Sequence, residues 1–146
     1  MADISLRPVT ADNWRPIVKL KLADEQKNWV APNWYSVLEA IYEDNLESRA
    51  IYDGDEPVGY VLFGKEADAN KHWIIRLMID IDHQKKGYGR AAMVQIIDLM
   101  QSHYKLDAIY ISFVPGNDVA RKLYEQLGFV DTGEMEEGEH IFKLPL

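Results

Sequence analysis

The pattern of apolar and polar positions changes from a strand-like to a helix-like spacing within the first third of the chain. Residues 4–9 alternate between apolar and polar side chains, which is typical of a strand with one buried face. Residues 14–22 and 36–42 instead repeat their apolar side chains at the three- and four-residue spacing of a helix. The sequence therefore predicts one strand followed by two helices.

A hairpin is predicted after the second helix. Segments 48–52 and 58–63 contain β-branched and aromatic residues, which favour strands. Residues 53–57 between them read Asp-Gly-Asp-Glu-Pro, a composition that favours a turn. The polar residues 66–71 that follow predict a loop.

The second half of the chain alternates apolar runs with helical patterns. Residues 73–79 are apolar apart from Arg76, which favours a central strand covered on both faces. A helix with a broad apolar side is predicted at 91–100, and a second buried strand at 108–114. The remaining predicted elements are a short helix at 119–127 and a strand pair at 130–135 and 140–144.

The order of these elements indicates how they assemble. The strand–helix–strand unit from 73 to 114 implies a parallel crossover, whereas the hairpins on either side imply antiparallel neighbours. We therefore expect an α/β fold in which a mixed, mostly antiparallel sheet carries helices on both faces. No repeat, linker or change of composition is visible, so residues 1–146 are predicted to form a single domain.

Composition excludes several kinds of site. The chain has no cysteine, which rules out disulfides, thiolate zinc sites and cysteine nucleophiles. Its four histidines are scattered without the spacing of metal ligands, so no metal site is predicted. Residues 1–8 lack a basic region followed by an apolar one, and no apolar run approaches the roughly 20 residues of a membrane span. We therefore expect a cytoplasmic protein without a membrane partner.

Charge narrows the class of partner. The 24 acidic and 16 basic residues give a net charge of −8, which argues against nucleic-acid binding because that needs a basic surface. A negative field suits a small cationic substrate. The alternative is that an acidic surface simply keeps the protein in solution.

Two motifs indicate the chemistry. The segment QKKGYG at residues 84–89 directly follows the predicted strand 73–79 and precedes a helix. Small residues let the backbone approach an anion, and the free N–H groups of the first helical turn point at it, so this turn is predicted to bind phosphate. The second motif, NDVARKLYEQLGF, occupies residues 117–129.

Together these motifs resemble the GNAT superfamily of N-acetyltransferases, and the resemblance covers nearly the whole chain. It implies a splayed parallel pair of strands, 73–79 and 108–114, with acetyl-CoA as co-substrate between them and no metal. Lys85, Lys86 and Arg90 would add charge at the phosphates, unless they form only a solvated basic turn. The cofactor site that the resemblance implies consists of Leu77, Met78, Ile79, Gln84, Lys85, Lys86, Gly87, Tyr88, Gly89, Arg90, Asn117, Ala120 and Tyr124.

The resemblance also assigns catalytic roles. Tyr124 would protonate the departing CoA thiolate; the alternative is a tyrosine that only packs in the core. Relatives that acetylate polyamines carry a glutamate where this chain has Ile75, so a direct carboxylate base on that strand is in doubt. Deprotonation through water is the expected substitute, with Asp80, Glu39 or Glu139 as candidate bases or, alternatively, as surface carboxylates.

A narrower resemblance concerns the amine. Segments 26–33, 36–40, 75–80, 132–134 and 138–139 look like those of bacterial spermine/spermidine (diamine) acetyltransferases. This implies a small cationic amine as the substrate, held by acidic residues and by Trp29, Trp34 and Tyr35 through cation–π contacts, unless these rings pack the loop onto the sheet. The substrate-binding residues predicted in this way are Glu25, Glu39, Asp80 and Glu139.

Two other functions stay open at this point. One is acetylation of a different amine: an amino acid, an aminoglycoside, or a protein N-terminus or lysine. The other is a regulatory CoA-binding module without turnover, which the intact motifs disfavour. Nothing in the sequence fixes the oligomeric state, and a homodimer that uses the strands after residue 130 is compatible with it.

Overall fold

One sheet of seven strands organises the computed structural model, which describes residues 3–66 and 70–146. The order of the strands across the sheet is β1-β2-β3-β4-β5-β7-β6. The strands are β1 (Ile4–Arg7), β2 (Leu46–Asp53), β3 (Glu56–Lys65), β4 (His72–Ile79), β5 (Ala108–Phe113), β6 (Val130–Glu136) and β7 (Glu139–Pro145). The helices are α1 (Trp14–Lys19), α2 (Asn33–Tyr42), α3 (Tyr88–His103) and α4 (Asp118–Gln126), with 3-10 helices η1 (Asp24–Gln26) and η2 (Ile81–His83).

The predicted strand pairing is confirmed. β4 and β5 are parallel, and every other neighbouring pair is antiparallel. Part of the loop predicted at 66–71, residues 67–69, lies outside the described residues, as do the first two residues of the N-terminal segment. None of the described helices combines the length and the apolar character needed to cross a membrane.

Element boundaries differ from the prediction around the first two helices. The first helix ends at Lys19 instead of Leu22, because Leu20 is extended and the next amide, that of Lys21, donates to Asp80 Oδ1 at 2.9 Å. That partner is 59 residues away, so no local pattern encodes it. The second helix begins at Asn33, three residues earlier than predicted. The two 3-10 helices carry no periodic apolar pattern and were not expected.

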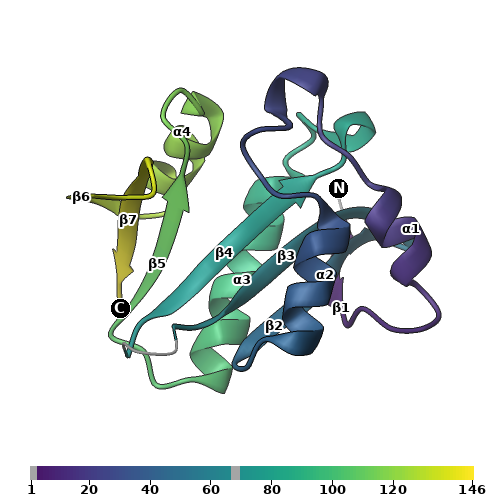
Figure 1. The fold of residues 1–146 in the computed structure, drawn as a ribbon, viewed down its shortest axis with the longest axis horizontal. Helices are drawn as coiled ribbons and strands as arrows, with labels where there is room; N and C mark the ends of the chain where they lie inside the picture. The colour runs from purple at the N-terminus through teal and green to yellow at the C-terminus, as the bar shows by residue number, and fades with distance from the viewer. Residues whose placement is uncertain (1–2, 67–69) are drawn as a thin grey trace.

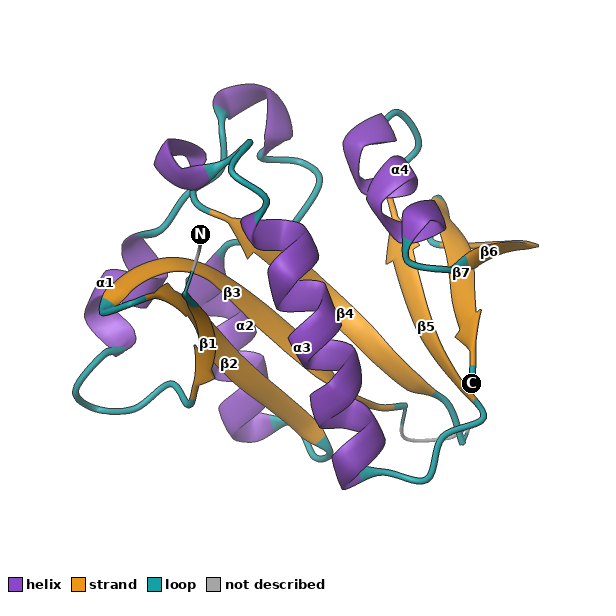
Figure 2. Cartoon of the chain, turned by 180° about the vertical axis from the view of Figure 1, so that it is seen from behind, coloured by secondary structure: helices purple, strands orange, loops and turns teal. Residues whose placement is uncertain are grey.

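Helices cover both faces of the sheet. α1 and α2 lie on the face that is in front in Figure 1, and α3 and α4 lie on the opposite face, which is in front in Figure 2. The side chains of β3 alternate between the two cores: Val61 and Phe63 pack on the α3 side, and Tyr60 and Leu62 on the α2 side. Burial on both faces explains the continuous apolar run that this strand shows in the sequence.

β4 and β5 separate soon after they begin. Their pairing is limited to three residues of β4, from His72 to Ile74, which lie opposite residues 109–111. The register between β3 and β4 shifts at the next residue, so that Ile75 is an extra residue in β4, a β-bulge. Beyond it the two strands diverge, as Figure 1 shows, and the edge of β4 that faces β5 has no strand partner there. The expected splayed parallel pair is therefore confirmed.

Candidate active site

A cleft of about 810 Å³ opens where β4 and β5 diverge. Its walls come from the second half of β4, the end of β5, the segment between η1 and α2, the turn before α3, the first half of α4 and the turn between β6 and β7. The cleft thus brings together, at one end of the sheet, segments from both halves of the chain.

The first motif forms one wall of the cleft at the N-terminus of α3. Gly87 is the N-terminal cap of this helix and has a φ of 84°, a left-handed conformation that side chains rarely adopt. The first α3 bond runs from the amide of Ala91 to the carbonyl of Gly87, so by helix geometry the amides of Tyr88 and the two residues after it have no intrahelical acceptor. All the motif residues except Lys86 line the cleft, as does Arg90. Free amides and cations therefore lie together where an anion would be stabilised.

Gln84 has its side chain engaged within the protein. Its Nε2 donates to the carbonyl of Ile79 at 3.0 Å and to Oε1 of Gln26 at 2.9 Å. Nε2 of Gln26 donates back to Oε1 of Gln84 at 3.2 Å. This pair of side-chain amides connects η1 to the end of β4 and fixes the turn before α3. Because the two glutamines are 58 residues apart, the local sequence pattern did not predict their contact.

Tyr88 anchors the first turn of α3 to the sheet. Its hydroxyl donates to Oδ2 of Asp53 at the end of β2. This hydrogen bond holds the pKa of Asp53 below its usual value and, from the other side, raises the pKa of Tyr88. The contact keeps the N-terminus of α3 in place beside the cleft.

The second motif forms the opposite wall through α4. Oδ1 of Asn117 accepts a hydrogen bond from the amide of Ala120 at 3.2 Å, so Asn117 caps the N-terminus of α4. Tyr124 is buried against the rings of Phe113 and Phe129, at centroid distances of 5.7 and 5.8 Å. Tyr124 nevertheless lines the cleft, and its hydroxyl has no hydrogen-bond partner among residues 3–66 and 70–146. Burial raises the pKa of Tyr124 above its usual 10.0, so the hydroxyl keeps its proton at neutral pH.

The four acidic residues predicted to bind the amine have different places. Only Glu139 lines the cleft, where its Oε1 accepts a hydrogen bond from the Ser112 hydroxyl at 3.3 Å. Asp80 is buried, and its carboxylate accepts from the amides of Lys21 and Asp82. The remaining two are Glu39, which pairs with Arg76, and Glu25, which is exposed on η1.

Arg76 occupies the wall of β4 beside the bulge. Its guanidinium donates to Glu39 and to the Ser36 hydroxyl, both on α2, and lies 5.4 Å from the ring of Tyr35. The arginine therefore fastens α2 to the open part of β4. It also lines the cleft, so its charge, partly balanced by Glu39, is part of the site.

Of the three aromatic residues predicted to hold the amine, one lines the cleft and two do not. Trp29 lines the cleft, whereas Trp34 and Tyr35 lie outside its lining and are 54% and 46% exposed. Glu137 in the turn between β6 and β7 was not predicted, yet it lines the cleft close in sequence to Glu139. The acidic run in this turn was the available signal. No group of three or more potential metal ligands is found within the described part of the chain.

Comparison with known proteins agrees with the geometry of the cleft. Residues 14–129 match the acetyltransferase (GNAT) family. The chain belongs to this family. The resemblance carried by the two motifs is therefore confirmed, and the protein is a member of the GNAT acetyltransferase family.

Individual relatives of this GNAT protein include polyamine enzymes. The spermine/spermidine N(1)-acetyltransferase of Bacillus subtilis is 27% identical over 145 residues, which cover 94% of this chain and 95% of that protein. A chimera of the spermidine N-acetyltransferase SpeG from Vibrio cholerae and hSSAT has a TM-score of 0.75 at 20% identity, covering 99% of this chain and 96% of that chain.

A further solved structure was determined with the cofactor. The PaiA N-acetyltransferase of Thermoplasma acidophilum, in complex with coenzyme A, has a TM-score of 0.73 at 12% identity, and the match covers 99% of each chain. At such low identity, the solved structures establish the shared fold.

Proposed function

We propose that this GNAT protein acts as one domain that transfers the acetyl group of acetyl-CoA to a primary amine of spermidine, spermine or a related diamine. The observation that carries the proposal is the position of Glu139, a carboxylate that lines the cleft and is oriented by Ser112. Glu137 adds a second carboxylate on the same turn, and Trp29 adds an aromatic surface to the lining. Such a lining suits an alkyl chain that carries ammonium groups. The names of the Bacillus subtilis and Vibrio cholerae relatives support the same substrate class.

The cofactor end of the cleft fits acetyl-CoA. Free amides at the start of α3, together with Lys85 and Arg90, offer donors to a pyrophosphate, with Lys86 at the solvent edge of the turn. The unpaired edge of β4, from Leu77 to Ile79, offers backbone groups to the pantetheine arm. Bound acetyl-CoA supplies the activated acyl group as a thioester; the chain's own residues bind, orient and move protons.

Tyr124 is proposed as the acid that protonates the CoA thiolate. The hydroxyl is protonated at neutral pH because burial raises its pKa, and no described side chain competes for its proton. Tyr124 belongs to α4 and lines the cleft, which supports its access to a thioester bound there. General-acid assistance of this kind contributes about 10²- to 10⁴-fold to turnover.

Glu139 is proposed as the group that accepts the proton of the amine, directly or through water. Among the three carboxylates considered for this role, it alone lines the cleft. The carboxylates of Asp80 and Glu39 are engaged by backbone amides and by Arg76, respectively. A carboxylate that has only a weak donor in Ser112 is the one available for an ammonium group.

A second candidate acceptor is an amino acid. Arg76 and Lys27 both line the cleft and offer positive charge to a carboxylate on the substrate. The partial neutralisation of Arg76 by Glu39 makes this acceptor the weaker candidate.

A thiol-release assay with acetyl-CoA and a panel of amines tests the proposal. We expect spermidine and spermine to give higher kcat/KM than lysine, other amino acids, aminoglycosides and peptides. Glu139→Gln should raise the KM for spermidine, whereas Glu136→Gln, which changes an exposed carboxylate outside the cleft, should not. An amino acid ranked above the polyamines would overturn the substrate assignment, and equal effects of the two variants would remove the role of Glu139.

A further inference from the structure

A second pocket lies at the other end of the sheet from the cleft. Its volume is about 410 Å³. β4 starts beside this pocket, at His72, and ends at the cleft, at Ile79, so the two sites are separated by the length of a strand. The residues that line the second pocket are Asn45, Lys65, Asn70, His72, His103, Tyr104 and Lys105.

The lining of this pocket is unusual for a protein of net charge −8. Among the described residues, it contains two lysines, two histidines and two asparagines, and no acidic residue. Neither Lys65 nor Lys105 has an acidic partner within 4 Å in the part of the chain that the structure describes. An ammonium group carries three hydrogen-bond donors and no acceptor, so the lining is rich in donors.

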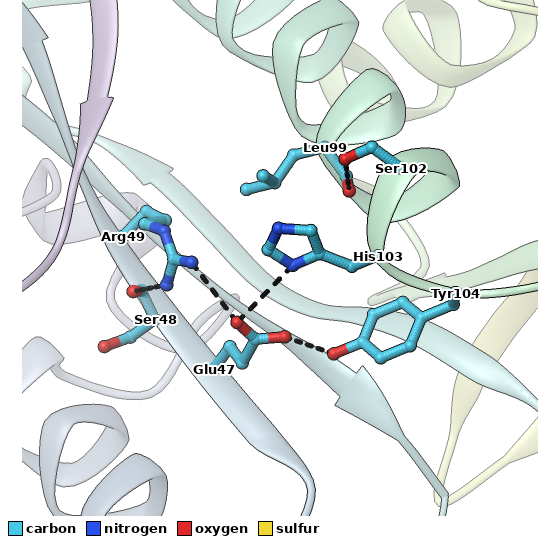
Figure 3. A network of polar contacts seen from close by, with 7 residues as sticks. All are labelled: Glu47, Ser48, Arg49, Leu99, Ser102, His103 and Tyr104. Atoms are coloured by element: carbon cyan, nitrogen blue, oxygen red, sulfur yellow. Dashed lines mark hydrogen bonds and ion pairs between the residues drawn. The ribbon is translucent and has the colours of Figure 1, made fainter.

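A carboxylate that contacts two residues of the lining, Glu47, is already engaged. Glu47 on β2 accepts hydrogen bonds from the hydroxyl of Tyr104 and from Arg49, at 3.2 Å in the second case, and lies 3.8 Å from Nδ1 of His103 (Figure 3). These contacts hold Tyr104 and orient His103 at the pocket wall. Because Arg49 balances the charge of Glu47, this carboxylate does little to offset the positive charge of the two lysines.

His72 adds a buried donor. Its side chain is 6% exposed, stacks on the ring of Tyr104 at a centroid distance of 4.5 Å, and has no hydrogen-bond partner among the described residues. Among the described residues, the fully buried side-chain polar atoms without a partner are the Tyr60 hydroxyl and Trp73 Nε1, and the His72 nitrogens do not belong to this group. The imidazole of His72 is therefore accessible from the pocket, where its N–H can donate to an acceptor.

The rim of the pocket is rigidly built. The carbonyl of Asn45 accepts the amide of Lys65 at 3.1 Å, and a Cβ added at Gly64 would lie 2.1 Å from that carbonyl oxygen. Only glycine therefore allows β3 to approach this closely, and the approach places Asn45 and Lys65 side by side. The negative end of the α3 dipole is nearby, but its effect falls off within the last turn and is smaller than that of two ammonium groups.

We propose that this pocket binds a small multivalent oxyanion, with phosphate as the simplest example. Lys65 and Lys105 supply the charge, and His72 and the two asparagines supply further donors. The site is separate from the acetyl-transfer cleft and does not depend on the substrate proposed for it. Its occupancy would join the end of β3, the start of β4 and the segment after α3.

Imidazole proton NMR of the whole chain tests the proposal with inorganic phosphate as the probe. The four histidines report on different places: His72 and His103 on the pocket, His83 on the cleft, and His140 on neither. Each resonance is assigned by a single His→Gln variant. At constant pH and ionic strength, we expect phosphate to shift the signals of His72 and His103 saturably, and acetate, a monovalent oxyanion, to do so much more weakly.

Charge variants identify the residues responsible. Lys65→Gln combined with Lys105→Gln should weaken phosphate binding, measured at His72, by about tenfold or more, because two charge-assisted contacts are lost. The matched control is Lys19→Gln combined with Lys122→Gln, which removes two exposed lysines outside both pockets and should leave the affinity unchanged. Circular dichroism checks that both variants are folded. Shifts that do not saturate, that sodium chloride reproduces, or that both double variants reduce equally would overturn the site.

Discussion

Replacing Tyr124 by phenylalanine separates catalysis from stability. The change removes one hydroxyl that has no hydrogen-bond partner among the described residues and keeps the ring that packs on Phe113 and Phe129. A typical lost hydrogen bond costs about 0.5–1.5 kcal/mol, but none is lost here. The free energy of unfolding should therefore change by less than about 0.5 kcal/mol. Tyr124→Ala would instead leave a cavity and cost about 3–5 kcal/mol.

Turnover, unlike stability, should fall strongly in Tyr124→Phe. If the hydroxyl protonates the CoA thiolate, its loss should lower kcat by about 10²- to 10⁴-fold, with little change in the KM of either substrate. Because burial raises the pKa of Tyr124 above 10.0, the wild-type hydroxyl is protonated throughout the neutral and mildly alkaline range. The ratio of wild-type to variant rate should then be constant between about pH 7 and about pH 9.

Steady-state thiol release and urea unfolding, measured on the same preparations, decide between the two roles. Unchanged turnover across this pH range would refute the assignment of the acid. A loss of more than about 1 kcal/mol in unfolding free energy, with a matching loss of active enzyme, would show that the hydroxyl has a structural role.

Three further predictions concern residues outside the reacting groups. Gln26→Ala should lower the unfolding free energy by about 1–3 kcal/mol, since the side chain takes part in three hydrogen bonds, and a urea midpoint equal to that of wild type would contradict the amide pair. Gly64→Ala should lower the free energy of unfolding by about 2–3 kcal/mol, because its Cβ would overlap with the Asn45 carbonyl oxygen. In the control Gly89→Ala the Cβ would meet its nearest atom at 3.7 Å, so the free energy of unfolding should stay within about 0.5 kcal/mol of wild type. Similar urea midpoints for both variants would disprove the steric argument. Burial is the main cause, and the charge of Lys65 the second, that lowers the pKa of His72 below 6.5 in the folded protein. The unfolded chain therefore binds a proton at this imidazole at a higher pH than the folded chain does, so the free energy of unfolding falls as the pH drops below 6.5. The loss in urea midpoint between about pH 7.5 and about pH 5.5 should be smaller in His72→Gln, and an equal loss would rule this group out.

Much of the fold could be predicted because burial leaves a periodic trace in the sequence. The two-residue alternation predicted β1, although this strand ends at Arg7, two residues earlier than expected, and the apolar run of β4 and the helical spacing in α3 predicted those two elements. Boundaries failed where distant contacts decide them. α1 stops before Leu22 because an amide beyond its end is taken by Asp80, and a contact across 59 residues leaves no local pattern.

The site was predictable in part for the same reason. Patterns within single segments correctly predicted the turn before α3 and the short helix of the second motif. The choice among the candidate carboxylates for the amine depends on which of them have no other partner in the folded protein, and the local sequence does not encode this. Glu39 and Asp80 are engaged by Arg76 and by backbone amides, whereas Glu139 lines the cleft, although all three look alike as isolated acidic residues.

The bulge in β4 has a consequence for how this protein can diverge. Ile75 is an extra residue opposite a regular β3, so its removal would leave Ile74 and Arg76 facing the same sides as before. β4 would then lose its irregularity, and its edge would be free to continue pairing with β5 beyond Ile111. The length of one strand therefore decides whether the sheet is split or closed. Deletion of Ile75, which itself lines the cleft, is therefore expected to narrow the cleft by extending the β4–β5 pairing, so a change of one codon bears directly on how far the sheet is split.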